Sequence, residues 1–346
     1  MELVKEIEFE EAHRKGFKFV DVRTREEFEE FRIPGAVNVP LFTKEEREKV
    51  SKVYYEKGEK EARLYALELL GPKLHRIVRE LKKIKEENKN VAVYCWRGGL
   101  RSLAVAAIAN LSGVVVWRLK GGYRAFRNYI LKRMEELLKD KEVVVVYGKT
   151  GVGKTRMLRE LQEEGLPVID LEGLAGHRGS VFGGIGLKQP SQKMFDALVW
   201  QELERLKNSR FIVVEGESRK IGRLFVPEAL WKKMVEGRKV QVELPLEERI
   251  KISMEDYGVD RFSPEVYLEA LRRIRKILGD EKFREIERLI EEKRYPEAVR
   301  ELMVNYYDKL YQRSTPEVEK VIEGKSYREA KEKLKREIEE LYSTLG

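Results

Sequence analysis

The segment Gly148–Thr155 places the strongest constraint on the fold of this chain. It reads Gly-Lys-Thr-Gly-Val-Gly-Lys-Thr and matches the phosphate-binding pattern G-x-x-x-x-G-K-[ST] in full. Residues 143–147, four valines and a tyrosine, precede it and predict a buried β-strand. A glycine-rich loop between a strand and a helix lets backbone N–H groups surround one phosphate. We therefore expect an α/β domain built around a phosphate site.

We call the segment Gly148–Thr155 the P-loop and predict that all of its residues bind phosphate. The predicted phosphate-binding residues are Gly148, Lys149, Thr150, Gly151, Val152, Gly153, Lys154 and Thr155. Lys154 would reach the bound phosphates, and the hydroxyl of Thr155 could hold Mg²⁺. No other metal is predicted, because three histidines far apart in the sequence and a single cysteine give no metal-ligand spacing.

The single cysteine, Cys95, lies in a second loop that could stabilise an anion. Residues 91–94 predict a strand that ends at Cys95, glycines follow, and residues 103–111 predict a helix. Backbone N–H groups and the helix N-terminus would stabilise a thiolate, and Arg97 and Arg101 could add positive charge if they point inward. Cys95, Arg97 and Arg101 are the predicted catalytic residues. The alternative is an inert buried cysteine.

Composition narrows the class of partner. The chain has 346 residues, enough for two domains with cores of their own. The formal net charge of +9 favours a polyanion such as tRNA, although a charged surface of the thermophile type would give the same balance. No apolar run approaches the roughly 18 residues of a membrane span, and the N-terminus lacks the pattern of an export signal. We expect a cytoplasmic protein with no membrane partner.

Alternating strand and helix patterns predict two α/β domains with parallel sheets. In the first domain, residues 1–130, strands are expected at 17–22, 91–94 and 114–117, with a helical stretch at 44–84. In the second, residues 131–245, strands are expected at 143–147, 167–171, 211–215 and 239–244. Residues 246–346 predict a basic, helical extension that contacts tRNA. Examples of residues that could contact tRNA are Arg272, Arg273, Arg275 and Lys276. Each of them could equally belong to a helix face that contacts only solvent.

Three polar, glycine-rich segments of the second domain predict a substrate site, at 170–183, 189–192 and 215–222. Long loops of this composition beside a P-loop usually line a site. His177 could act as an acid or base and Arg178 as an anion clamp, while Asp170 and Glu215 are strand-end acids that could assist a metal. The predicted set is Asp170, Glu172, His177, Arg178, Ser180, Gln189, Glu215, Glu217 and Ser218. The alternative is a group of soluble loops held by local hydrogen bonds.

Four segments of the first domain resemble a rhodanese domain: Asp21–Arg23, Ile33–Pro40, Cys95–Ser102 and Leu119–Tyr123. The resemblance implies that Cys95 carries sulfur or selenium. Five residues separate Cys95 from Arg101, one more than in typical sulfurtransferase loops, and this spacing also occurs in Cys-dependent phosphatases. A wider loop could hold a phosphate-bearing ligand, which leaves both a phosphatase and a selenophosphate-using enzyme open.

The order of the two domains, the insert at 45–72 and the segments between 170 and 222 resemble the tRNA 2-selenouridine synthase family. The resemblance runs from about Phe19 to Glu243 and implies an N-terminal rhodanese-like parallel-sheet domain plus a P-loop NTPase-like α/β domain with a helical C-terminal extension. The implied activity is geranylation of wobble 2-thiouridine from geranyl diphosphate, followed by replacement of the geranylated sulfur with selenium from selenophosphate. The implied partners are the tRNA and an enzyme that supplies selenophosphate.

Two other functions stay open on the residues alone. A P-loop kinase or NTPase fused to a Cys-dependent phosphatase or sulfurtransferase would contain the same two loops. Against the phosphatase, no acidic residue lies near Cys95 in an obvious general-acid position. A non-catalytic RNA-binding or regulatory protein could use both loops as ligand sensors.

Overall fold

The computed structural model describes residues 3–258, 261–314 and 316–343, and the chain divides into two compact units, Met1–Arg133 and Met134–Gly346. Each unit contains a five-stranded sheet in which every strand runs parallel to its neighbours. The predicted fold class, two α/β domains with parallel sheets and a helical C-terminal region, is confirmed.

The sheet of the first unit has the strand order β1-β5-β4-β2-β3. Its strands are β1 (Glu6–Ile7), β2 (Lys18–Asp21), β3 (Val37–Asn38), β4 (Val91–Tyr94) and β5 (Trp117–Leu119). The run 91–94 is buried throughout because a central parallel strand is covered on both faces. The strand predicted at 114–117 corresponds to β5, which lies further towards the C-terminus, at Trp117–Leu119. The Asn110 side chain bonds both the N–H and the C=O of Val116 and so replaces a strand partner there.

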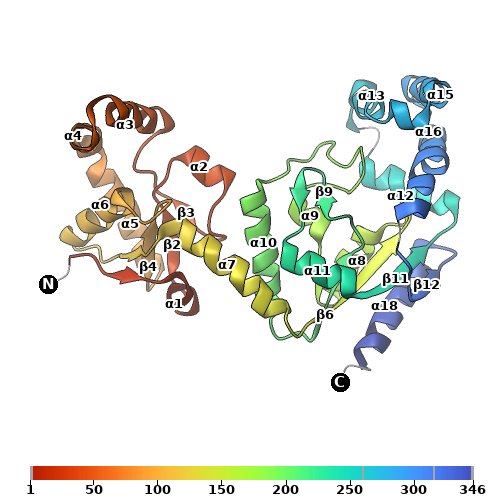
Figure 1. The fold of residues 1–346 in the computed structure, drawn as a ribbon, viewed down its shortest axis with the longest axis horizontal. Coiled ribbons are helices and arrows are strands. Elements are labelled where there is room, and N and C mark those ends of the chain that lie inside the picture. The colour runs from red at the N-terminus through yellow and green to blue at the C-terminus, as the bar shows by residue number, and fades with distance from the viewer. Residues whose placement is uncertain (1–2, 259–260, 315, 344–346) are drawn as a thin grey trace. The chain divides into compact units, whose positions relative to one another are not determined.

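The helices of the first unit surround this sheet (Figure 1). They are α1 (Phe9–Arg14), α2 (Arg25–Glu30), α3 (Lys44–Lys57), α4 (Glu59–Leu70), a 3₁₀ turn (Gly71–Lys73), α5 (Leu74–Glu87), α6 (Leu100–Leu111) and α7 (Gly122–Leu138). Helices α3 to α5 and the turn between them confirm the helical stretch predicted at 44–84. Helix α7 begins in the first unit and ends at Leu138, past the unit boundary at Arg133. Cys95 follows β4, which places its loop at the carboxyl edge of the sheet, where α/β proteins bind ligands.

The sheet of the second unit has the order β12-β11-β6-β8-β7. Its strands are β6 (Glu142–Gly148), β7 (Val168–Ile169), β8 (Phe211–Glu215), β11 (Arg238–Glu243) and β12 (Lys320–Glu323), and a separate antiparallel hairpin contains β9 (Lys220–Ile221) and β10 (Leu224–Phe225). The central strand β6 carries the P-loop at its carboxyl end.

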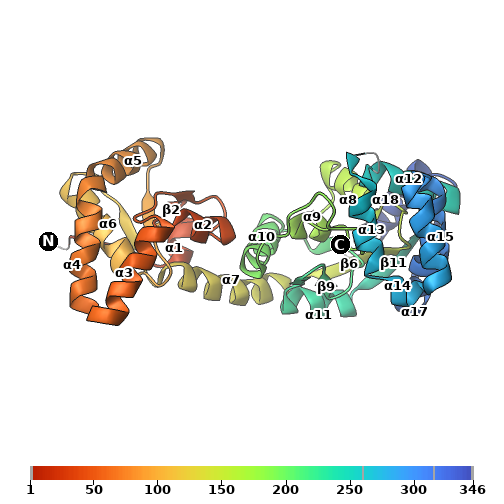
Figure 2. The ribbon, with the colours of Figure 1, turned by 90° about the horizontal axis from the view of Figure 1, so that it is seen from above.

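The helices of the second unit pack on the sheet and in a separate helical cluster. They are α8 (Lys154–Glu163), α9 (Leu171–Ala175), α10 (Gln192–Arg205), α11 (Glu228–Glu236), α12 (Leu246–Tyr257), α13 (Pro264–Arg272), α14 (Arg275–Leu278), α15 (Asp280–Glu291), α16 (Tyr295–Leu302), the π turn η3 (Met303–Tyr307), α17 (Asp308–Ser314) and α18 (Tyr327–Ser343). Helices α13 to α17 with η3 form the helical cluster, which lies together in Figures 1 and 2. Its core includes Leu271, Phe283 and Ile286. None of the described helices is long and apolar enough to cross a membrane.

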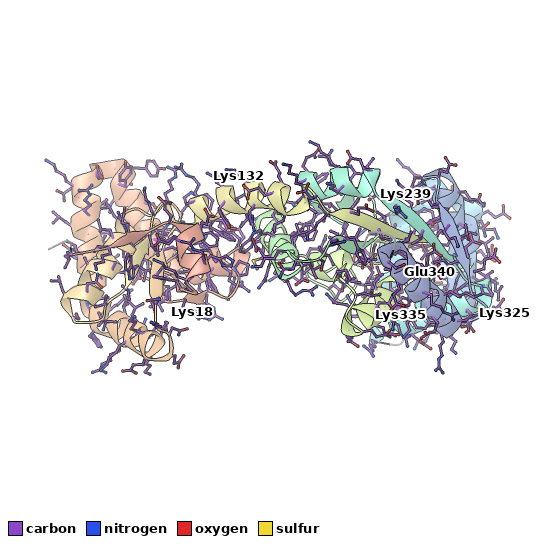
Figure 3. The ribbon with its side chains drawn as sticks, turned by 90° about the horizontal axis from the view of Figure 1, so that it is seen from below. Lys18, Lys132, Lys239, Lys325, Lys335 and Glu340 are labelled. Carbon is purple, nitrogen blue, oxygen red and sulfur yellow. The ribbon has the colours of Figure 1, made fainter. Side chains whose placement is uncertain are left out.

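Residues 246–346, expected to form a helical extension, are mostly helical but also contain the strand β12. Strand β12 pairs in parallel with β11 and completes the sheet of the P-loop. Helix α18, marked by Lys335 and Glu340 in Figure 3, buries Ala330, Leu334 and Ile338 in the core of that sheet. Sequence reasoning missed β12 for two reasons. Its four residues include only two apolar ones, which gives a weak strand pattern, and its partner β11 is distant in the sequence.

Candidate functional site

The first candidate site is the loop between β4 and α6, which holds Cys95. The Cys95 side chain is 3% exposed and packs against the apolar core of its unit. Its sulfur also meets polar groups: the Gly99 N–H donates to Sγ at 3.2 Å, and the Ser102 hydroxyl oxygen lies 3.3 Å from Sγ. The Ser102 hydroxyl also lies 3.2 Å from the Gly99 carbonyl oxygen, to which it donates while the sulfur is a thiol. The Gly99 N–H stabilises a thiolate, and the Ser102 hydroxyl would add a second donor once the sulfur is ionised. Sequence reasoning did not single out Ser102, whose only signal is its place in the first turn of the helix that follows the loop.

A second backbone segment closes this loop from behind. The N–H groups of Tyr123 and Arg124 donate to the carbonyl oxygens of Cys95 and Trp96 at 2.9 and 3.0 Å. Gly122 sits so close to the loop that a Cβ on it would lie within 3.0 Å of the Cys95 carbonyl oxygen. The two segments, distant in sequence, therefore form one rigid frame around the thiol.

Arg97 and Arg101 are the other two predicted catalytic residues. Arg101 donates from Nη1 to Oε2 of Glu27 at 2.9 Å, and Arg97 is exposed. The Arg101 guanidinium is therefore shared with Glu27, and a catalytic role for Arg97 and Arg101 stays a prediction. Helix α2 brings the Glu27 carboxylate to Arg101, and this carboxylate competes with Cys95 for the positive charge of the guanidinium.

The second candidate site is the P-loop, which faces a cavity of about 1290 Å³. The loop residues that line the cavity are Gly148, Thr150, Gly151, Gly153, Lys154 and Thr155. Lys149 is not among them, and Val152 is 1% exposed and packs in the core beneath the loop. The Lys154 ammonium donates to the Gly148 carbonyl oxygen at 2.8 Å, which holds it across the loop. Lys239, labelled in Figure 3, lines the same cavity from β11.

The carboxylate that meets the P-loop is Glu172. The Thr155 hydroxyl donates to its Oε2 at 2.5 Å. Burial, and next the neighbouring Glu217, raise the pKa of Glu172 to about 8, so this carboxyl retains a proton near neutral pH. Glu215 is fully buried below the cavity, where burial and then Asp170 raise its pKa well above the usual value. The acidic side chain that contacts Thr155 is thus Glu172, and a metal role for Asp170 and Glu215 stays a prediction.

The cavity brings together six of the nine predicted substrate-site residues. These are Glu172, His177, Arg178, Ser180, Glu217 and Ser218. Asp170, Gln189 and Glu215 do not line it. Asp170 accepts the Gly173 N–H at the start of α9 and pairs with Arg159. The Gln189 side-chain amide bonds the backbone of two separate segments, the end of α9 at Ala175 and the β9–β10 hairpin at Ile221 and Arg223, and so links them.

Aromatic and imidazole groups complete the wall of the cavity. His177 accepts the Gly179 N–H at Nδ1, 3.2 Å away, and burial followed by Arg178 lowers the pKa of its imidazole. The Arg178 guanidinium lies 5.4 Å from the centre of the Tyr257 ring. Further aromatic residues that line the cavity are Tyr147, Trp231, Tyr307 and Tyr311. Sequence reasoning missed them because they come from segments far apart in the chain.

The four basic residues predicted to contact tRNA lie at the end of α13 and in α14. All four are exposed. Arg273 pairs with Glu269 at 3.0 Å and Arg275 with Asp280 at 2.7 Å, which reduces the local positive potential. Contact of Arg272, Arg273, Arg275 and Lys276 with tRNA stays a prediction.

Comparison with known proteins agrees with this architecture. The model of the tRNA 2-selenouridine synthase AAA domain matches residues 141–341, and that of the rhodanese-like domain matches residues 2–129. The chain is 33% identical over 332 residues to a tRNA 2-selenouridine synthase of Hydrogenovibrio crunogenus, covering 88% of this chain and 91% of the relative. It is 32% identical over 338 residues to one of a Sulfurovum species, covering 90% and 92%.

Among solved structures, the N-terminal domain of a protein described as ATP/GTP-binding, from Clostridium difficile 630, is 36% identical, with a TM-score of 0.35. The match covers 36% of this chain and 98% of that one. The first family model spans more than half of the chain, and the curated relatives exceed 30% identity over most of it. The chain therefore belongs to the tRNA 2-selenouridine synthase family.

Proposed function

We propose that this chain is a cytoplasmic, RNA-binding transferase that converts 2-thiouridine at the wobble position of tRNA into 2-selenouridine, in two steps. The observation that carries the proposal is the P-loop cavity of about 1290 Å³, which has room for a diphosphate and a second reactant. The names of the relatives support tRNA as the substrate. The net charge of +9 suits the same partner.

The first step is geranylation. The C2 sulfur of thiouridine attacks C1 of geranyl diphosphate, the C–O bond to the diphosphate breaks, and the nucleobase gives up its N3 proton. The P-loop N–H groups and Lys154 would stabilise the negative charge that grows on the departing diphosphate. The product carries an electrophilic C2 and a sulfur that can leave as a thiolate, which the original thiocarbonyl cannot do.

Mg²⁺ fits the P-loop side of this cavity. The Thr155 hydroxyl and the Glu172 carboxyl, 2.5 Å apart, are hard oxygen donors of the kind that Mg²⁺ prefers. Among the described residues no group of three or more acidic, His or Cys side chains could hold a metal, so water and diphosphate would complete the shell. When bound, Mg²⁺ supplies charge neutralisation to the diphosphate, and Glu172 would bind it as a carboxylate.

The second step is selenation. Selenium delivered by selenophosphate attacks C2 of the geranylated base, and geranylthiolate leaves. The resulting adduct holds selenium between C2 and phosphorus; the Cys95 thiolate, stabilised by the Gly99 N–H, would attack this phosphorus, the Se–P bond breaks, and the selenium stays on C2. Water then hydrolyses the phosphorylated Cys95 to phosphate and the free thiol. This step depends on a partner enzyme that supplies selenophosphate.

Mass spectrometry of tRNA nucleosides tests both steps, after incubation of the protein with thiolated tRNA, geranyl diphosphate and selenophosphate. Lys154→Ala should block geranylation, and Cys95→Ser should stop short of selenouridine. Matched controls are Lys232→Ala, an exposed lysine of α11, and Ser112→Ala, at the end of α6. Selenouridine at wild-type yield from Lys154→Ala or Cys95→Ser refutes the role assigned to that residue.

Two assays separate this proposal from the other functions that contain the same loops. Geranyl diphosphate should compete with ATP for the P-loop, and tight ATP binding with turnover and no competition would favour a kinase or NTPase. Hydrolysis of an aryl phosphate that is lost in Cys95→Ser would favour a Cys-dependent phosphatase.

A further inference from the structure

A second, smaller cavity adjoins the P-loop within the second unit. Its free volume is about 60 Å³, and its walls come mostly from the helical cluster. The apolar and aromatic side chains that carry the argument are Phe182, Tyr267, Ile290, Tyr295, Leu302 and Met303. Side chains of this kind favour a hydrocarbon ligand over a sugar or a phosphate.

The small cavity and the P-loop cavity share a border. Thr150, Ser253, Tyr257 and Tyr307 line both of them. A Cβ built on Gly151 would lie 2.6 Å from both Met303 Cε and Ser253 Oγ, so the tip of the P-loop touches two residues of the small cavity directly. A ligand whose charged end occupies the P-loop is thus within reach of apolar walls.

The helical cluster is held in this position by a buried ion pair. Arg249 of α12, 3% exposed, donates from Nε to the Thr150 carbonyl oxygen at 2.9 Å and pairs with Asp308 at 2.6 Å. The guanidinium therefore ties α12, the P-loop and the start of α17 together. Because Thr150 lines both cavities, this contact holds α12 against their shared border.

We propose that the small cavity receives the distal end of the hydrocarbon chain of a prenyl diphosphate whose diphosphate lies on the P-loop; this rests on the proposed function. The free volume of about 60 Å³ is small, so the terminal methyl groups of the chain fit first. Met303 is unbranched and flexible, and its rotation admits more of the chain. The rest of the chain crosses the border past Thr150 and Tyr257.

Calorimetric titration of the full chain with inorganic pyrophosphate, dimethylallyl diphosphate and geranyl diphosphate tests this site. The two prenyl esters carry the same charged group and differ by five carbons. Geranyl diphosphate should bind about 15- to 60-fold more tightly than dimethylallyl diphosphate, since each of two or three buried CH₂ groups contributes about fourfold. Pyrophosphate should compete with both.

Two variants change the cavity in opposite directions. Ala298→Leu places a larger side chain in its wall, where Ala298 is 2% exposed, and should remove the preference for geranyl over dimethylallyl diphosphate. Leu302→Ala enlarges it and should improve the binding of farnesyl diphosphate about tenfold relative to geranyl diphosphate. Val304→Leu, at an exposed position of η3, should alter neither ratio. Unchanged pyrophosphate affinity shows that each variant is folded.

The outcomes distinguish the cavity from the proposed function. Equal affinity for geranyl and dimethylallyl diphosphate, with pyrophosphate still competing, overturns the prenyl site and leaves the P-loop as a diphosphate site. A geranyl preference that survives in folded Ala298→Leu also overturns it. Failure of all three ligands to bind refutes the diphosphate role of the P-loop itself.

Discussion

Gly122→Ala tests whether the loop around Cys95 depends on a close backbone contact. Gly122 opens α7 with φ of +59°, and a Cβ there would lie closer than 3.0 Å to the Cys95 carbonyl oxygen and the Gly98 nitrogen. Both neighbours are backbone atoms, so the chain itself must move. A left-handed φ costs an Ala about 1–2 kcal/mol and overpacking about 1–3 kcal/mol. We expect the free energy of unfolding of the first unit to fall by about 2–5 kcal/mol.

Gly113→Ala is the matched control for this prediction. Gly113 has φ of +78°, and nothing lies within 4 Å of a Cβ built on it. Gly113→Ala therefore carries only the cost of a left-handed φ and no cost of overpacking. Scanning calorimetry of the full chain should place the melting temperature of Gly122→Ala about 3–10 °C below that of Gly113→Ala. Iodoacetamide should label Cys95 at an altered rate only in Gly122→Ala. Equal melting temperatures for the two variants would refute the close-contact reasoning.

Three further substitutions each remove one contact. Ser102→Ala should slow the labelling of Cys95 by iodoacetamide at pH 7 about fivefold, since a hydrogen bond to the thiolate is worth about 1 kcal/mol. Burial opposes ionisation of Glu27, but Arg101 and other donors hold its pKa below 4.5; the pair therefore stabilises the fold above pH 4.5. Glu27→Gln should cost about 1 kcal/mol in urea unfolding at pH 7, and this cost should disappear as the pH falls through the folded pKa. Arg249→Met should cost about 1–3 kcal/mol in the same assay, because it leaves the partly exposed Asp308 carboxylate and the Thr150 carbonyl oxygen without their donor.

Each of these substitutions has a matched control. Ser112 is exposed and bonds a backbone carbonyl of its own helix, Glu26 is exposed beside Glu27, and Arg300 pairs with Glu247 on the surface. Ser112→Ala should leave the labelling rate of Cys95 within about twofold of the unsubstituted protein, and Glu26→Gln and Arg300→Met should each change the free energy of unfolding by less than about 0.5 kcal/mol. A contact is contradicted if its variant behaves like the control.

Local patterns in the sequence were sufficient for most of the backbone. The strands at 91–94 and 211–215 match the prediction residue for residue, and α5 buries Ile77 and Leu81, which lie four residues apart on one helical face. These elements are decided by neighbours a few residues apart, which a sequence displays directly. The shift of β5 and the existence of β12 depend on Asn110 and on pairing with β11, and no short window contains those partners.

The candidate sites divide in the same way. The sequence by itself determined that a P-loop and a cysteine loop exist and which residues they contain, because a phosphate cradle needs its glycines, Lys154 and Thr155 at fixed spacing. Only the tertiary structure decided that Arg101 turns to Glu27 and that Glu172, rather than Glu215, meets Thr155. The physical reason is that the partner of a charged or polar side chain is set by distance and burial in space, which spacing along the chain does not encode.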